Sequence, residues 1–107
     1  MKEKQTLVYV TISHLDDYQG ATFFRVGEEL TLKKDEGNEF DDEAIAVYDK
    51  NNTKSGYVAN SVSTVIRGTY SAGRIYDLIK DRIRCSIKFI LVEEGKAIGV
   101  VNNTEND

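Results

Sequence analysis

The sequence has one cysteine and one histidine among its 107 residues, and these scarcities exclude several kinds of site. Because Cys85 stands alone, no disulfide can form within the chain, and a reducing, cytoplasmic setting fits. His14 has no cysteine or second histidine near it in sequence, so neither a zinc site nor a histidine-based catalytic centre is indicated. We expect His14 to be a surface or capping residue.

Long apolar runs are also missing. Residues 1–5 carry charge, and Thr11, Ser13 and His14 interrupt the first apolar stretch early. A secretory signal peptide needs about 7 to 15 apolar residues in a row, and a membrane-spanning helix needs about 20. The sequence therefore predicts no signal peptide, no membrane span and no membrane partner.

Motifs of enzyme chemistry are absent as well. There is no glycine-rich phosphate loop and no nucleophile elbow around a serine. Cys85 falls on the inward row of an alternating segment, which favours a buried, inert thiol over a nucleophile. The acidic run at residues 35–43 lacks the alternating ligand order and the mid-loop glycine of a calcium site. We expect no enzyme, no metal and no cofactor, and this acidic run alone keeps a small metal-dependent enzyme open as a minor alternative.

Charge is unevenly distributed along the chain. The formal net charge of -4 and the pI near 5.0 argue against electrostatic wrapping of long nucleic acid. Residues 28–43 hold eight acidic and two basic side chains, whereas residues 67–88 hold six basic and two acidic ones. The second segment indicates a basic face suited to phosphates, with Arg67 and Arg74 as candidates. An ordinary solvated surface is the alternative.

Alternating apolar residues predict a mainly β fold. Candidate strands lie within residues 7–12, 23–26, 30–33, 45–48, 56–59, 83–91 and 98–101. The longest of them turns Cys85, Ile87 and Phe89 to one side, so we expect this strand to be central and these three side chains to be buried together.

Two short helices are expected ahead of that strand. Val62, Val65 and Ile66 fall at helical spacing behind a cap at Asn60 or Ser61. A second apolar face, behind a cap at Ser71, consists of Ile75, Leu78 and Ile79. Each helix has room for only a few turns.

The number of strands favours closure into a small barrel, because open sheet edges invite aggregation. We predict one domain over residues 1–101, a small β-barrel with two short α-helices before the penultimate strand. Residues 102–107 are polar and have nothing to bury, so a disordered tail is expected there.

The loop between the third and fourth candidate strands is the most informative segment. Gly37 and Asn38 tolerate positive φ, and Phe40 and Asp41 come where the chain re-enters the sheet. A ring, an amide and a carboxylate on one anchored loop can stack on a ligand ring and accept hydrogen bonds. In the structural alternative, Asn38 takes a left-handed turn, Phe40 plugs the barrel and Asp41 caps a backbone N–H.

This loop and its flanks resemble the HIRAN domain family, over roughly Val8 to Leu91. The matching residues are Gly27, Leu30, Leu32, the run Asn38-Glu39-Phe40-Asp41, Ala44, Ile45, Val47 and Gly56-Tyr57-Val58. The resemblance implies an OB-like β-barrel. In its best-understood members the domain is fused to helicase-like DNA translocases and captures single-stranded DNA at a free 3′ end. No part of this chain remains to make an ATPase, so we expect a bare module.

The resemblance also implies which residues contact DNA. Asn38 and Asp41 match residues that contact the terminal nucleotide, and Asp41 matches the one that takes the 3′-hydroxyl. Phe40 replaces a tyrosine, which keeps stacking and loses a phenolic hydrogen bond. Tyr57 stands where a binding member has histidine, and Tyr18 is the one match in the first loop.

Some positions depart from the DNA-binding pattern. Ala59 lies near the position of a phosphate-binding lysine, which is missing, and Asp16 and Asp17 would repel a phosphate near the first loop. We predict a non-catalytic module that recognises single-stranded DNA, at its 3′ end, in DNA repair or processing. The alternative is a protein-interaction or regulatory module that kept the barrel and lost DNA binding.

Overall fold

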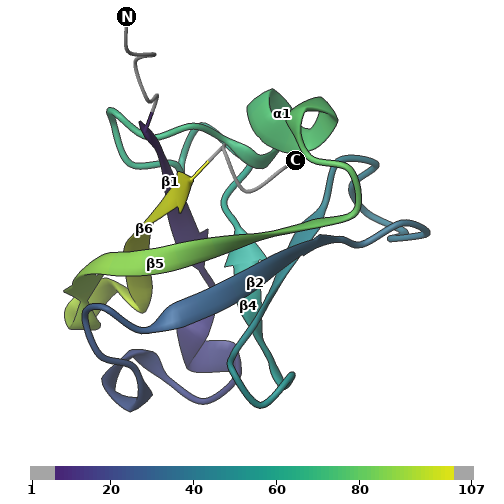
Figure 1. Cartoon of the computed structure of the whole chain (residues 1–107). Coiled ribbons are helices and arrows are strands. Elements are labelled where there is room, and N and C mark those ends of the chain that lie inside the picture. Colours follow the sequence, from purple (N-terminus) through teal and green to yellow (C-terminus); the bar gives the residue numbers. More distant parts are fainter. Residues whose placement is uncertain (1–6, 103–107) are drawn as a thin grey trace, which may run out of the picture.

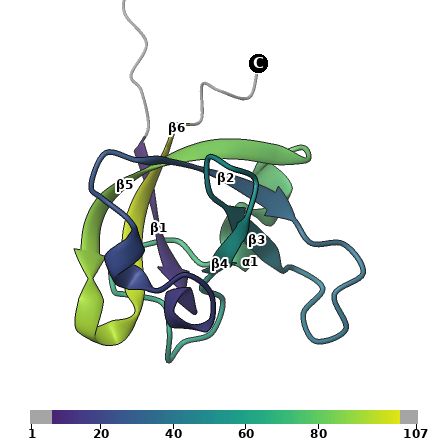
Figure 2. The same cartoon turned by 90° about the horizontal axis from the view of Figure 1, so that it is seen from below.

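A computed structural model describes residues 7–102, which form a closed barrel of six antiparallel strands (Figure 1). The strands are β1 (Leu7–Ser13), β2 (Glu29–Lys34), β3 (Ile45–Tyr48), β4 (Lys54–Val58), β5 (Arg82–Leu91) and β6 (Lys96–Asn102). Their order around the barrel is β1-β4-β3-β2-β5-β6, closed by pairing of β6 with β1, and Figure 2 shows it from below. The predicted small β-barrel is confirmed. The predicted polar tail lies outside the described residues, apart from Asn102 at the end of β6.

Alternating apolar side chains fill the barrel. Val10 and Ile12 of β1 are fully buried, and Ile83, Cys85 and Ile87 of β5 are buried as well. Residues two apart share one face of a strand, so each such run supplies one column of the core. Burial raises the pKa of the Cys85 thiol to about 12, which keeps it protonated and unreactive, as predicted.

A β-bulge in β5 overturns the prediction for Phe89. The pairing of β5 with β6 shifts between Ile87 and Phe89, because β5 carries one extra residue there. The alternation breaks at this point, and the Phe89 side chain turns outward, 61% exposed. Phe89 therefore does not share the core with Cys85 and Ile87, and its predicted burial is wrong.

The second predicted helix forms, in a shorter version than expected. Helix α1 (Ala72–Ile75) begins behind Ser71, whose hydroxyl accepts a hydrogen bond from the Arg74 N–H. A 3₁₀ turn (Tyr76–Leu78) follows it directly. No helix within the described residues is long and apolar enough to cross a membrane.

The first predicted helix, behind Ser61, is not formed. The Ile66 N–H donates to Oγ1 of Thr11 in β1 at 3.0 Å, and not to a carbonyl one helical turn back. Val62 is 99% exposed, so the apolar residues at helical spacing share no buried face. Hydrogen bonding to β1 thus overrides the local pattern, and the chain crosses this region in successive turns.

The predicted strand at residues 23–26 is also absent. The chain makes a 3₁₀ turn (Ala21–Phe23), and the Phe24 ring is buried while Phe23 and Val26 are exposed. The expected strand is therefore replaced by a turn with one buried side chain, that of Phe24, and six strands close the barrel instead of seven.

Gly56 of β4 allows a close approach between β4 and β1. A Cβ atom at this position would lie 2.6 Å from the carbonyl oxygen of Ser13. Gly56→Ala has to push the two strands apart, so we expect it to lower the free energy of unfolding by about 1 to 3 kcal/mol. Urea denaturation followed by circular dichroism measures this change. An unaltered midpoint would mean that the strands do not approach this closely in solution.

Candidate functional site

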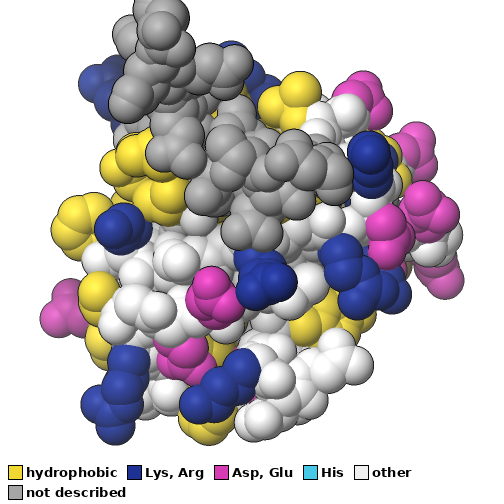
Figure 3. Space-filling model, in the orientation of Figure 1, with side chains coloured by type: hydrophobic (Ala, Val, Ile, Leu, Met, Phe, Trp, Pro, Cys, Tyr) yellow, Lys and Arg dark blue, Asp and Glu magenta, His cyan; other side chains and the backbone are white. Residues whose placement is uncertain are grey.

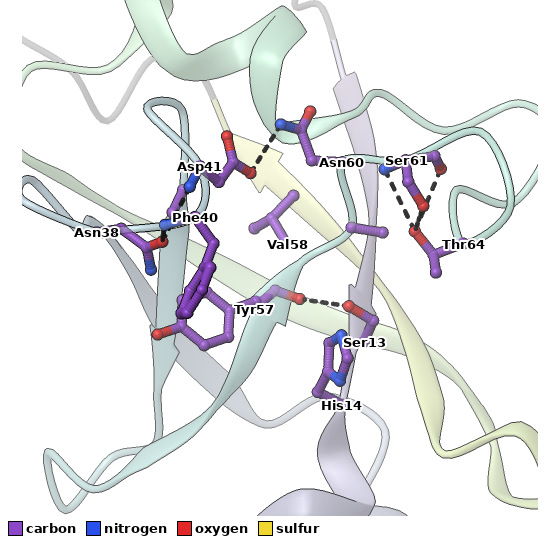
Figure 4. A pocket seen from close by; sticks show the side chains of 12 residues that line it. Ser13, His14, Asn38, Phe40, Asp41, Tyr57, Val58, Asn60, Ser61 and Thr64 are labelled. Carbon is purple, nitrogen blue, oxygen red and sulfur yellow. Dashed lines mark hydrogen bonds between the residues drawn. The ribbon is translucent and has the colours of Figure 1, made fainter.

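A cleft opens between the β2–β3 loop and the segment that follows β4 (Figure 4). Its volume is about 540 Å³. It is lined by Ser13, His14, Asn38, Phe40, Asp41, Ala44, Tyr57, Val58, Ala59, Asn60, Ser61 and Thr64. Four of the residues singled out from the sequence, Asn38, Phe40, Asp41 and Tyr57, thus lie around one hollow.

Side-chain hydrogen bonds fix the shape of the β2–β3 loop. Oδ1 of Asn38 accepts hydrogen bonds from the backbone N–H groups of Phe40 at 2.8 Å and Asp41 at 3.0 Å. Oδ1 of Asp41 accepts one from the N–H of Glu43 at 2.9 Å. Short polar side chains that bond to the following backbone hold a turn in one conformation. The loop is therefore organised before any ligand arrives.

The structural alternative for this loop is correct for Asp41 and fails for Asn38 and Phe40. Asp41 does cap a backbone N–H, and its carboxylate also lines the cleft. The positive φ, 88°, belongs to Gly37 and not to Asn38. Phe40 does not plug the barrel, because its side chain is 92% exposed, and no other described ring packs against it. An unpartnered ring at the rim is a surface on which a flat ligand can stack.

Four side chains tie the loop to β4. Oδ2 of Asp35 accepts hydrogen bonds from Nδ2 of Asn38 and from the hydroxyl of Tyr57, both at 3.0 Å. Nζ of Lys54 donates to the same hydroxyl at 2.5 Å and lies 4.5 Å from the centroid of the Tyr57 ring. The hydrogen bond from Asn38 is the main cause that lowers the pKa of Asp35, and the bond to Tyr57 raises the pKa of Lys54. Both ends of the network are therefore charged.

The lowered pKa of Asp35 predicts that acid loosens the loop. The folded-state pKa lies below the ordinary value of 3.8, so the stabilisation is present at neutral pH and is lost as the pH falls through the folded value. We expect the amide protons of Phe40 and Asp41 to exchange faster below about pH 4, relative to those of β5. Hydrogen exchange followed by NMR tests this. Asp35→Asn should weaken the pH dependence, and an unchanged profile in that variant would assign the effect to another carboxyl.

Asn60 holds the opposite wall of the cleft, a role that the sequence did not indicate. Its Nδ2 donates to Oδ2 of Asp41 at 3.0 Å, and its Oδ1 accepts a hydrogen bond from the N–H of Gly73 in α1 at 2.7 Å. Figure 4 shows this amide between the loop and the helix. From the sequence, Asn60 is a candidate helix cap and not a cleft residue. It lies 19 residues from Asp41, so no local pattern joins them.

The cleft offers little positive charge. No described lysine or arginine lines it, and His14 is the one lining residue able to carry a positive charge. Nδ1 of His14 lies 3.0 Å from Oδ2 of Asp17. The Asp41 carboxylate accepts hydrogen bonds from Glu43 and Asn60 but forms no salt bridge with a described residue. Its remaining acceptor sites are available to a hydroxyl.

The other three residues predicted from the sequence lie outside the cleft lining. Arg74 stacks on the Tyr70 ring, 4.6 Å from its centroid, and Arg67 is exposed in the turns before α1. Tyr18 is 41% exposed at the end of the 3₁₀ turn that follows β1. Figure 3 shows basic side chains spread over the β2–β5 face and acidic ones gathered where the β2–β3 loop projects. Phosphate binding by Arg67 and Arg74 stays a prediction.

Within the described residues, no group of three or more His, Cys, Asp or Glu side chains is placed to hold a metal ion. Within the acidic run, Asp35 and Asp41 instead accept hydrogen bonds from neighbouring amide and hydroxyl groups.

The cleft and the five strands β1 to β5 fall within residues 6–93, which match the HIRAN domain. A crystal structure of a protein from Lactobacillus plantarum, determined by a structural genomics consortium, has a TM-score of 0.61 and 19% identity. The likeness covers 92% of this chain and 95% of that chain, and at this identity it concerns the fold alone. No curated protein matches the sequence. The chain belongs to the HIRAN domain family, which is associated with DNA binding.

Proposed function

We propose that the chain is a non-catalytic module that binds single-stranded DNA at its 3′ end, in DNA repair or processing. The observation that carries this proposal is the Asp41 carboxylate, which lines the cleft with no described lysine or arginine beside it. A free 3′-hydroxyl can donate to such a carboxylate, whereas a phosphate is repelled by it. The site therefore favours the end of a strand over its middle.

Two aromatic rings of the cleft supply the second part of the proposed contact with DNA. Phe40 and Tyr57 both line the cleft, and Phe40 is free of packing contacts with other described rings. With the terminal hydroxyl on Asp41, the last base lies within reach of these ring faces. Stacking of this kind tolerates any base, because every base has a π-face.

Phe40→Ala should weaken binding by about 1 to 3 kcal/mol whichever base ends the strand. Because the ring is 92% exposed, the free energy of unfolding should change by no more than about 0.5 kcal/mol. Fluorescence anisotropy with four strands that differ in the last base measures the effect. Phe23→Ala, an exposed aromatic outside the cleft, is the control. A loss confined to one base would contradict stacking as the source of affinity.

A protein partner with a basic segment is the second candidate. Six of the nine residues in the run 35–43 are acidic, and the exposed Phe40 stands among them. A ring surrounded by carboxylates suits a peptide rich in lysine and arginine. This arrangement would serve a regulatory module that has lost DNA binding.

Titration of a short labelled single strand and of a labelled Lys/Arg-rich peptide, both at low salt, separates the two candidates. The DNA proposal predicts saturable binding of the strand that Asp41→Ala weakens. Binding of the peptide without any binding of the strand would instead establish the protein-partner function.

A further inference from the structure

A strand with its 3′ end at Asp41 can leave the cleft on two sides. Figure 4 shows Asp41 and Asn60 at one end of the cleft and Tyr57 and His14 at the other. A strand that crosses the cleft from Asp41 to this other end passes either the imidazole of His14 or the ring of Tyr57. Since its backbone carries one negative charge for each nucleotide, the charges beyond these two residues decide the route.

The exit past His14 is acidic. The hollow beyond it is lined by Asp16, Asp17 and Glu94. The one lysine in that hollow, Lys96, is paired with Glu94 at 3.8 Å, and His14 is paired with Asp17. The carboxylates outnumber the free cations there, so this route repels a phosphate.

The exit past Tyr57 leads to Lys54. Its ammonium lies 4.5 Å from the centroid of the Tyr57 ring, which lines the cleft. Lys54 donates a hydrogen bond to Tyr57 and stacks on its ring. No other lysine or arginine side chain in the described part of the chain makes either kind of contact with a residue that lines the cleft. Lys54 forms no salt bridge with a described carboxylate; the Asp35 carboxylate, which accepts a hydrogen bond from the Tyr57 hydroxyl, is near enough to help raise the pKa of Lys54. One of its three N–H groups is used by that hydroxyl, which leaves donors for a phosphate.

Aromatic side chains continue along the same exit. Tyr48 is paired with Lys54 across β3 and β4, and Tyr18 is close enough to contribute to the raised pKa of Lys54. Tyr18 is also exposed. The surface beyond the cleft thus combines a cation with phenol rings, a pattern suited to a single strand.

We propose that Lys54 binds the backbone phosphates of the nucleotides next to the 3′ end, so that the strand leaves the cleft past Tyr57 towards Tyr18. This inference rests on the proposed function, because it assigns the route of the same strand. It places the phosphate contact on β4, whereas the basic stretch around Arg67 and Arg74 lies outside the cleft lining.

The test pairs Lys54→Gln with a chemically altered strand. One strand has ordinary phosphates throughout, and the other carries neutral methylphosphonates at the two linkages nearest the 3′ end. On the ordinary strand, Lys54→Gln should weaken binding about three- to tenfold and reduce the slope of log K against log salt by about 0.7. On the neutral strand the same substitution should have no effect. Lys50→Gln, in the β3–β4 turn and outside the cleft, should leave both strands unaffected.

Two further variants separate the charge of Lys54 from its support of Tyr57. Lys54→Arg should keep most of the affinity, because it keeps the charge. Tyr57→Phe removes the hydroxyl that accepts the Lys54 hydrogen bond, and it should leave the difference between the two strands intact. If Lys54→Gln weakens both strands equally, Lys54 acts only on the loop and the inference is wrong. If the wild type binds no single strand at all, the proposed function itself fails.

Discussion

Replacing Asp41 with alanine should abolish the preference for a free 3′-hydroxyl over a 3′-phosphate. In the wild type, a terminal phosphate places a second anion beside a carboxylate that has no lysine or arginine near it in the cleft. Two unit charges about 4 Å apart interact by about 4 kcal/mol near a protein surface, and by less where salt screens them. We therefore expect the wild type to prefer the hydroxyl-ended strand by about 2 to 4 kcal/mol and the variant to bind both strands equally.

Asp41→Asn separates the charge from the hydrogen bond. The amide oxygen can still accept a hydrogen bond from the Glu43 N–H and from a hydroxyl, but the side chain carries no charge, and its NH₂ group cannot accept the hydrogen bond from Asn60. Discrimination against the phosphate should therefore fall, while affinity for the hydroxyl-ended strand drops by only about 1 kcal/mol. Competition binding with both strands gives the two values. If Asp41→Ala kept full discrimination, the terminal hydroxyl would have to lie elsewhere.

Ile87→Ala should lower the free energy of unfolding by about 2 to 5 kcal/mol, whereas Phe89→Ala should lower it by about 1 kcal/mol or less. Ile87 is fully buried in the barrel, and the bulge that follows it leaves Phe89 61% exposed. The smaller side chain thus supports the fold and the larger one does not. Removing a buried methylene-rich side chain costs its transfer energy and leaves a cavity.

Urea unfolding of both variants measures this difference directly. The m-value should stay near that of the wild type, because neither change alters the surface exposed on unfolding by much. Two equal losses, or a larger loss for Phe89→Ala, would mean that the alternation of β5 runs through to Phe89 without the bulge.

The β2–β3 loop was largely predictable because its structure is local. Gly37 takes the positive φ, and Asn38 and Asp41 bond to backbone groups within three residues of themselves. Such short-range turns depend on the identity of a few neighbouring residues, which a sequence displays. The exposure of Phe40 was the undecided point, because a phenylalanine in a loop fits burial and stacking equally well.

Features that depend on distant parts of the chain were missed. The bulge after Ile87 arises from the pairing with β6, and the turns at Ile66 arise from a hydrogen bond to Thr11, 55 residues away. Asn60 and Lys54 reach the site through contacts with Asp41 and Tyr57 that no spacing rule announces. Periodicity reports which face of a segment is apolar, and it does not report which other segment lies against that face.

End capture is tested most directly by comparing three forms of one single-stranded sequence at low salt: with a free 3′-hydroxyl, with a 3′-phosphate, and closed into a circle. The arrangement of Asp41 and Phe40 in a cleft lined by no described lysine or arginine predicts tight binding of the first form and weak binding of the other two. Equal affinity for all three forms would contradict recognition of the 3′ end. No affinity for any of them would contradict DNA binding and favour a protein partner at the cleft.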